Sequence, residues 1–507
     1  MTFKRSINKS ALLATAIGGI VGSGWLFGPF YAARIAGPAA IISWILAGLL
    51  MIIIAFTFVI LTRSLPIAGG TVRFFQLTHG HFVGFSFSWI AWLAWVSVTP
   101  IETLALLQYA TNYMPFLMKS ATHTKVLSLY GYLVAIVLMV IMYTINVKGI
   151  KWLTKTNFFI VILKLAIPIV AVLILFSTNF NVSNFYSYHG FTPMGIQSIL
   201  TALPIAGVIY SFIGFNPAVQ LAAEVKDPKT AIPFAIIGSL LICIVLYTAI
   251  QIAFIGALHV GALQHGWQKL SFVGDAGPFA GMMIGLGMIW FVKLLYFDAV
   301  ISPFGTALVQ AAATGRMTYA MSQNHYFPNY FMRLNKHHAP IKAMLLNLIV
   351  GLLFLLPFPN WQKMVGFLVS CLVFGYVVGP MSLIAIRKDK KTTLLCLVAF
   401  YICNLIIYWT GWSVIAKVSI AFAIGYLLLI AYMSIPSIRA KLNLDIKKGW
   451  WVIPYIVGLV LISYCGSFGG GMNIIKFGWD FAVIIIFTII IFYIAKSTVN
   501  ITTISAL

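Results

Sequence analysis

The chain has 507 residues, of which 62% are hydrophobic and only 8% are charged, and its formal net charge at pH 7 is +24. A soluble globular domain carries roughly 25% charged residues, so this composition excludes an ordinary soluble protein. Apolar runs long enough to cross a bilayer recur from end to end, which predicts an all-α polytopic membrane protein. The alternating strands of a transmembrane barrel are missing from the sequence.

The apolar runs predict about fourteen transmembrane spans, or about twelve if one of the later pairs is misread. In chain order we expect them at about residues 11–33, 39–62, 82–113, 126–146, 157–177, 196–222, 234–258, 279–313, 343–358, 363–386, 392–412, 414–436, 450–468 and 479–497. With cytoplasmic termini, 23 of the 32 Lys and Arg residues fall on the inside and 7 on the outside. The positive-inside rule produces such a split, so the basic excess indicates membrane topology and not a nucleic-acid partner.

The first span contains the stretch "GGIVGSGWLFGP", with five glycines and a proline. Each interior glycine costs a helix about 1 kcal/mol relative to alanine. The sixth span contains a similar set of Pro204, Gly207, Gly214 and Pro217. Backbone groups freed by a helix break must face protein, water or a ligand inside a membrane. The two segments therefore predict broken helices around a shared polar cavity, unless the glycines only allow close helix packing.

The two broken spans occupy corresponding positions in opposite orientations, because five spans separate their starts. This arrangement is typical of inverted-repeat transporters. Backbone N–H groups at helix N-termini favour a carboxylate, and freed carbonyls accept hydrogen bonds from an ammonium group. An α-amino acid carries both groups, so the pattern predicts an amino acid substrate.

Charged residues also fall inside predicted spans: Glu102, Lys164, Lys293 and Asp298. A central charge costs at least ~2.5–3.5 kcal/mol, so such residues usually face a cavity or a partner. A structural ion pair or a tilted helix is the alternative. Lys164 is the main candidate for proton coupling, since a lysine that alternates between wet and dry surroundings can bind and release a proton. Asp298 and Glu102 are further proton-site candidates in equivalent spans of the two repeats.

Several motifs resemble those of a known superfamily. Gly22-Ser23-Gly24 is similar to the G-(S/T)-G motif of the amino acid–polyamine–organocation (APC) superfamily, and "YSFIGFNPAVQLAAEVKDPKTAIP" and "RMTYAMSQNHYFPNYF" resemble its other signatures. Together these motifs cover about residues 10–385. Within the superfamily, "NVKGIKWLTKTNFFIVILK" and "LLYFDAVISPFGTALVQ" look most like the aspartate–proton symporter branch.

The resemblance implies a LeuT-like fold of two inverted five-helix repeats with additional C-terminal transmembrane helices. The transporter core would occupy residues 1–386, with repeats at about 11–177 and 196–386, and the C-terminal helices would occupy 387–507. The resemblance further implies substrate binding along both unwound segments. The corresponding residues are Ile20, Gly22, Ser23, Gly24, Tyr210, Ser211, Phe212, Ile213, Gly214 and Asn216.

By the same resemblance, Tyr210 falls where family members place a gating aromatic side chain. Lys164 matches a lysine of proton-coupled members in the fifth span. Its amine would contact carbonyl groups near Gly18 and Gly19 and polar groups near Thr306. An amine fixed there would fill the space of a coupling sodium ion, which favours protons as the coupling ion.

We therefore expect a proton-coupled importer of aspartate or a similar small amino acid in the inner or plasma membrane, without a cofactor. An amino acid/polyamine exchanger would use the same broken-helix site and stays an alternative, although Asn216 is neutral where some arginine exchangers have glutamate. An intramembrane enzyme is a further alternative, but the chain has no HExxH motif and no His or Cys cluster with metal spacing. Either Lys293 or backbone N–H groups alone would meet an acidic substrate side chain. The sequence leaves the oligomeric state open.

Overall fold

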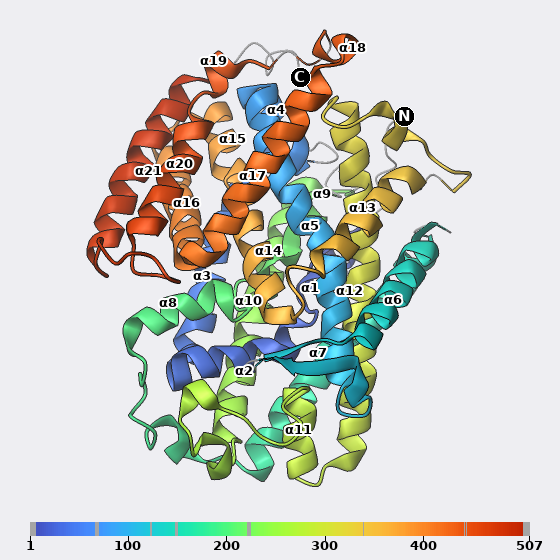
Figure 1. Ribbon diagram of the computed structural model, residues 1–507, viewed down its shortest axis with the longest axis vertical. Helices are drawn as coiled ribbons and strands as arrows, with labels where there is room; N and C mark the ends of the chain where they lie inside the picture. The colour runs from blue at the N-terminus through green and yellow to red at the C-terminus, as the bar shows by residue number, and fades with distance from the viewer. Residues whose placement is uncertain are drawn as a thin grey trace.

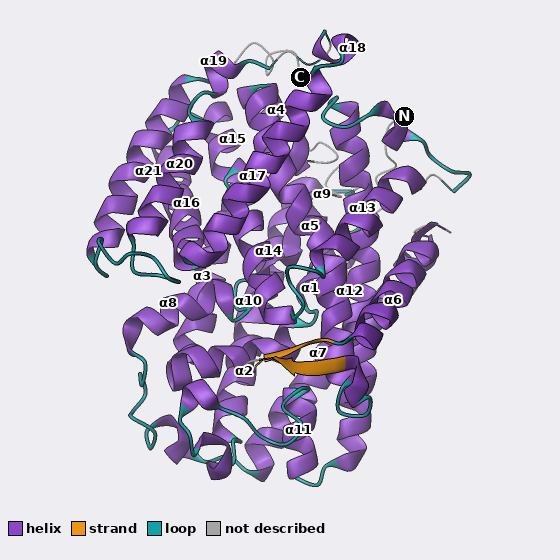
Figure 2. Ribbon diagram, in the orientation of Figure 1, coloured by secondary structure: helices purple, strands orange, loops and turns teal. Residues whose placement is uncertain are grey.

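The computed structural model describes residues 7–65, 70–121, 124–147, 151–220, 225–337, 339–440, 442 and 444–499. Within these ranges, eleven helices are long and apolar enough to cross a membrane. Figure 2 shows that the rest of the described secondary structure is also helical, apart from one small β-hairpin. The prediction of an all-α polytopic membrane protein is confirmed.

Each predicted span coincides with at least one helix of the structure. The helices are α1 (Lys9–Ile20), α2 (Gly24–Ala36), α3 (Ala40–Ser64), α4 (Gly70–His79), α5 (His81–Ala110), α6 (Leu129–Val147), α7 (Lys151–Thr178), α8 (Gly195–Ile205), α9 (Asn216–Gln220), α10 (Pro228–Gly256), α11 (Pro278–Gly285), α12 (Ile289–Gln323), α13 (Ile341–Phe354), α14 (Trp361–Tyr376), α15 (Val378–Ile386), α16 (Lys390–Trp409), α17 (Trp412–Met433), α18 (Pro436–Arg439), α19 (Ile446–Gly449), α20 (Val452–Cys465) and α21 (Trp479–Ser497). Helix α4 and the antiparallel hairpin of β1 (Met118–Ala121) and β2 (Thr124–Leu127) are elements that the sequence did not predict.

Both predicted helix breaks are confirmed. The first span divides into α1 and α2, and Val21 between them is extended, with φ −83° and ψ 93°. The sixth span divides into α8, the 3₁₀ helix η4 (Tyr210–Phe215) and α9. Gly207 lies at this second break with φ +83°, a conformation that L side chains rarely adopt.

Helix α5 runs through the centre of the molecule, and its side chains are buried almost throughout. It packs against α12 and α14, whereas α1 packs against α10, α7 and η4. The outer helices α6, α7, α17, α20 and α21 carry many exposed apolar side chains, as expected for surfaces that face lipid. Figure 1 shows the C-terminal helices α16, α17, α20 and α21 gathered on one side of the molecule.

The predicted span at 279–313 is wrong at both ends. Residues 278–285 form the separate helix α11, Gly287 follows with φ +71°, and α12 then runs from Ile289 to Gln323. The sequence did not predict this helix break, because the residues around it are apolar and only the glycines indicate a turn. The shift places Lys293 near the start of α12, where it is exposed, and not deep inside a span.

Candidate functional site

The two helix breaks lie against each other in the middle of the molecule. A Cβ atom on Gly214 would overlap the carbonyl oxygen of Gly19, and a Cβ on Gly24 would overlap the Ser211 hydroxyl. Only glycine therefore allows the α1–α2 junction to approach η4 this closely. The structure thus brings together most of the residues predicted to contact substrate.

Side chains from other helices satisfy backbone groups that the breaks leave outside the helical hydrogen-bond ladder. The pairs are Lys164 Nζ donating to Gly18 O (3.1 Å), Tyr247 OH donating to Ile20 O (3.2 Å), Ser23 N–H donating to Glu102 Oε2 (3.2 Å) and Tyr376 OH donating to Ile213 O (2.9 Å). The Gly22 N–H, in contrast, donates to no backbone carbonyl of the described residues. It is a backbone donor at the centre of the site that a ligand could use.

Glu102 projects from α5 between the two broken segments and is fully buried. Its Oε1 accepts a 2.6 Å hydrogen bond from the Tyr210 hydroxyl on η4. Its Oε2 accepts from the Ser23 N–H at the start of α2. The Glu102 carboxylate therefore connects the two broken segments. On the α2 side its partner is a backbone N–H at a helix N-terminus, which is a group suited to bind anions.

Lys164 reaches the site from α7 and is 2% exposed. Its ammonium group donates to Gly18 O at 3.1 Å and to the Thr306 hydroxyl on α12 at 2.8 Å. The contacts expected near Gly18 and with Thr306 are both present, whereas none is found with the Gly19 carbonyl. The amine is thus held between α1 and α12 by neutral acceptors.

Gly22 lies next to Glu102 and to Thr306, the hydroxyl partner of Lys164. A Cβ atom at this position would lie 2.9 Å from Glu102 Oε1 and 3.3 Å from Thr306 Oγ1. Glu102 and the Thr306 hydroxyl that binds Lys164 therefore both lie beside Gly22, but Glu102 and Lys164 form no ion pair within 4 Å. A small movement of the unwound backbone would change the surroundings of both charged groups.

An indole ring covers the site. Trp361, the first residue of α14, is fully buried and donates from Nε1 to Ser23 Oγ at 2.9 Å. Its ring lies edge to face with Tyr210, at a centroid distance of 5.8 Å, and stacks on Tyr31 at 5.7 Å. A Cβ on Gly207 would meet this indole ring, so the second break also makes room for Trp361.

Known proteins that are similar in sequence to this chain identify its family. The family model described as "Amino acid permease" matches residues 7–393. The chain is 34% identical over 513 residues to the glutamate/serine transporter AimA of Bacillus subtilis (strain 168), covering 97% of this chain and 93% of that protein. The chain belongs to the amino acid permease family. This permease is also 30% identical over 508 residues to the aspartate-proton symporter of the same organism, covering 98% of this chain and 97% of the relative.

A third relative is more distant: the methylthioribose transporter of Bacillus subtilis (strain 168) is 26% identical over 339 residues, covering 65% of the permease and 70% of the relative. The matched family and these relatives are all transporters or permeases, so the permease is a transporter and not an intramembrane enzyme. The predicted superfamily and its aspartate–proton symporter branch are confirmed. Within the described residues, no three His, Cys, Asp or Glu side chains come together as a metal site.

Some predicted residues of the permease lie apart from the contact between the breaks. The Phe212 ring packs against Trp44 and Tyr247, so this residue contributes to the site only through its backbone. Asn216 donates from Nδ2 to the Tyr376 hydroxyl at 3.2 Å. Lys293 is exposed near the start of α12, so its predicted role in reading an acidic substrate side chain is wrong.

Asp298 is buried in the permease and forms neither a hydrogen bond nor an ion pair within 4 Å with Glu102 or Lys164. It is 1% exposed, and both of its carboxylate oxygens lack a hydrogen-bond partner among the described residues. Asp298 and Thr306 are eight residues apart on α12, about 12 Å along the helix axis. Ser302 Oγ, one turn along α12 from Asp298, also lacks a partner there.

Three aromatic side chains that complete the site were not predicted from the sequence. Trp361, Tyr247 and Tyr376 each donate a hydrogen bond to Ser23 or to an unwound backbone segment. A tyrosine in the middle of an apolar span could have predicted such a contact, because a buried hydroxyl group usually has a hydrogen-bond partner. The role of Trp361 was harder to predict, because a tryptophan near the end of a span usually lies at the membrane–water interface.

Proposed function

We propose that this permease is a proton-coupled importer of small amino acids in the inner or plasma membrane, with cytoplasmic termini. The observation that carries the proposal is the 3.2 Å hydrogen bond from the Ser23 N–H to Glu102. A backbone N–H at the start of a broken helix is the group that a substrate carboxylate would use. Glu102 therefore holds the donor for which the substrate would compete.

This competition supplies a route for proton coupling. Two ionised carboxylates a few Å apart repel each other strongly in a low-dielectric site. A substrate carboxylate that binds the Gly22 and Ser23 N–H groups must therefore displace Glu102 or be accompanied by its protonation. Displacement of Glu102 would also break its hydrogen bond from the Tyr210 hydroxyl, so η4 would respond to the movement of Glu102. Substrate and proton would then enter together.

Lys164 complements this step because it supplies the positive charge of the site. Its ammonium group is held by Gly18 and Thr306, and it fills the space where the family resemblance implies sodium in other members. We propose protons as the coupling ion for that reason. Asp298 is a second proton-site candidate, since its buried carboxylate has no partner within the described residues.

The proposed substrates are aspartate, glutamate and serine. The relatives are named as a glutamate/serine transporter and an aspartate-proton symporter. Of the Lys and Arg residues whose side chains the structure describes, only Lys164 is buried. An acidic side chain would therefore find Lys164 or backbone N–H groups, which favours substrates held mainly by their α-amino and α-carboxylate groups.

For alternating access we propose two inverted repeats at about residues 11–177 and 196–386, which form a core of residues 1–386. One helix bundle would rock against the remaining helices around the midplane site. Trp361 and Tyr210 would cover the substrate on one side. The helices of residues 387–507 would stand outside this repeat.

The proposal is tested by uptake of labelled aspartate, glutamate and serine into proteoliposomes with an acidic exterior. Each amino acid is assayed with empty and with substrate-loaded vesicles, and with and without a protonophore. Uphill uptake into empty vesicles that the protonophore abolishes is the expected result. Uptake that needs internal substrate and ignores the pH gradient would establish an exchanger instead.

The role of Lys164 has its own test. We expect Lys164→Ala to lose accumulation driven by the pH gradient, because the positive charge and both of its hydrogen bonds disappear. Thr306→Val is the matched variant, since it removes one acceptor of the ammonium group but keeps the charge, and it should retain partial accumulation. If Lys164→Ala accumulates substrate as the wild type does, then Lys164 is only structural.

A further inference from the structure

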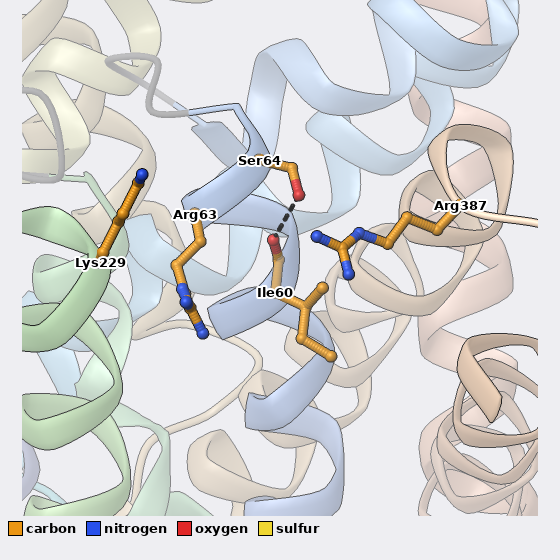
Figure 3. A pocket seen from close by; sticks show the side chains of 5 residues that line it. All are labelled: Ile60, Arg63, Ser64, Lys229 and Arg387. Carbon is orange, nitrogen blue, oxygen red and sulfur yellow. Dashed lines mark hydrogen bonds between the residues drawn. The ribbon is translucent and has the colours of Figure 1, made fainter. Parts of the chain in front are cut away.

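A basic pocket lies at the C-terminal end of α3, remote from the helix breaks. It has a volume of about 270 Å³ and is lined by Ile60, Arg63, Ser64, Lys229 and Arg387. Figure 3 shows Arg63 and Lys229 on one side of the α3 terminus and the Arg387 guanidinium group on the other. Three segments that are distant in the sequence, the end of α3, the first turn of α10 and the junction of α15 with α16, therefore meet at this pocket.

The three cations of the pocket form no salt bridge with an acidic side chain among the residues that the structure describes. The salt bridges among the described residues are Lys125–Asp275 and Lys448–Asp445, and neither involves the pocket. Two carboxylates lie near the pocket cations and interact with their charges, Asp227 with Lys229 and Asp389 with Arg387. Neither carboxylate comes within salt-bridge distance, and each forms a local hydrogen bond. Asp227 accepts from the Thr230 hydroxyl at 2.7 Å, and Asp389 accepts from the Thr392 N–H at 2.9 Å. Three positive charges around one pocket repel one another, and a bound anion would offset that repulsion.

The surroundings of the pocket indicate where this anion comes from. Helix α3 exposes a continuous apolar stripe, in which Ile42, Ile45, Leu49 and Phe56 are 40% to 51% exposed. The same helical spacing continues to Arg63. A helix of 25 residues is about 37 Å long, so its ends reach the headgroup level of a bilayer whose hydrocarbon core is about 30 Å thick. Acyl chains can therefore follow α3 to a headgroup beside Arg63.

We propose that this pocket binds the phosphate of an anionic phospholipid, with the acyl chains lying along the exposed face of α3. Arg63 and Arg387 offer planar guanidinium groups that match a phosphate in two-point contact, and Lys229 adds a third charge. The lipid connects α3, α10 and the α15–α16 junction at one membrane surface. This site is independent of the transport chemistry, because none of its residues touches the helix breaks.

The test uses the purified full-length permease in detergent and native mass spectrometry to count bound lipids. The ligands are palmitoyl-oleoyl phosphatidylglycerol, the zwitterionic phosphatidylcholine with the same chains, and inorganic phosphate. The pocket variant combines Arg63→Gln, Lys229→Gln and Arg387→Gln. The control variant combines Lys336→Gln, Arg439→Gln and Lys447→Gln, which removes the same charge from exposed positions outside the pocket.

We expect the wild type and the control variant to retain phosphatidylglycerol in preference to phosphatidylcholine. The pocket variant should bind phosphatidylglycerol at least about ten-fold more weakly, because each basic group near an anionic headgroup contributes roughly five-fold in affinity. Arg387→Gln alone repeats the comparison with a smaller loss, in case the triple variant folds poorly. Equal retention by the pocket variant and the wild type, or equal losses in both triple variants, would overturn the proposal. Inorganic phosphate that binds as tightly as the lipid would reveal a free-anion site and overturn it as well.

Discussion

Glu102 and Asp298 are both buried carboxylates in central helices, but they differ in their contacts. Glu102 accepts hydrogen bonds from the Tyr210 hydroxyl and from the Ser23 N–H, the backbone donor that a substrate carboxylate would use. Asp298 accepts no hydrogen bond from either helix break, and both of its carboxylate oxygens lack a partner among the described residues. We therefore assign substrate-linked protonation to Glu102 before Asp298.

Because the two helix breaks are in close contact, one added methyl group at Gly214 should lower the stability of the permease strongly. Gly214→Ala should destabilise the permease by about 1–3 kcal/mol, which is typical of overpacking in a core, because the added Cβ would overlap the Gly19 carbonyl. The unwound backbone would have to shift, so transport should fall as well. Thermal unfolding in detergent and uptake assays measure the two effects.

Gly366→Ala is the matched control for this substitution. Gly366 lies in α14, and a Cβ there would meet no atom within 4 Å. We expect it to be neutral or stabilising by up to ~1 kcal/mol, since alanine favours a helix over glycine. A Gly214→Ala protein as stable and active as Gly366→Ala would contradict the account of the helix contact.

For single residues, the sequence predicted the candidate site side chains better than it predicted their contacts. A charge in an apolar span is costly, which marked Glu102, Lys164 and Asp298. Glu102 and Tyr210 are 108 positions apart in the sequence. Their contact cannot be predicted from residue spacing along one helix. Lys164 was an exception, because the family resemblance implied its neighbours.

Among the elements, the broken spans were predictable because glycine and proline act locally on the backbone. The start of α14 was not, since the predicted span began at residue 363 and left Trp361 outside. Asn360 gives the physical reason for the earlier start: its side chain accepts from the Lys363 N–H and caps the helix. The cap places Trp361 in the first turn, where its indole ring reaches Ser23.

The position of Trp361 over the breaks predicts a role in holding substrate. Trp361→Phe keeps a ring against Tyr210 but removes the hydrogen bond to Ser23 Oγ. A hydrogen bond of this kind contributes about 1 kcal/mol, so we expect the KM of uptake to rise about five-fold. Trp290→Phe is the control, because Trp290 is 58% exposed at the start of α12. Equal KM values for the two variants would show that the indole does not take part in substrate binding.

For the molecule as a whole, the C-terminal helices form a buried polar contact of their own. Asn404 on α16 donates to Thr488 on α21 at 2.9 Å and accepts from the Tyr455 hydroxyl on α20 at 2.8 Å. All of these side chains are buried. Interhelical hydrogen bonds of this kind contribute about 0.6 kcal/mol on average in membranes, so they stabilise helix association modestly.

Substitutions in this C-terminal contact should therefore lower the stability of the permease without changing its transport. Asn404→Ala should lower thermal stability by roughly 1 kcal/mol and leave the KM unchanged, because the site lies between α1 and η4. Thr488→Val and the Asn404→Ala/Thr488→Val double variant complete a double-mutant cycle. The loss of stability in the double variant should be smaller than the sum of the two single losses. A large change in KM for Asn404→Ala would place the C-terminal helices in the transport mechanism.

The most direct test of the central claim is the proton flux that accompanies substrate uptake. Wild-type and Glu102→Gln permeases are placed in proteoliposomes that contain a pH-sensitive dye, and aspartate, glutamate or serine is added outside. The account predicts that substrate acidifies the interior of wild-type vesicles. Glu102→Gln vesicles should exchange labelled for unlabelled substrate but should show no acidification. Substrate uptake by the wild type without any proton movement, or an unchanged proton flux in Glu102→Gln, would contradict the assignment of Glu102 as the group that couples proton and substrate.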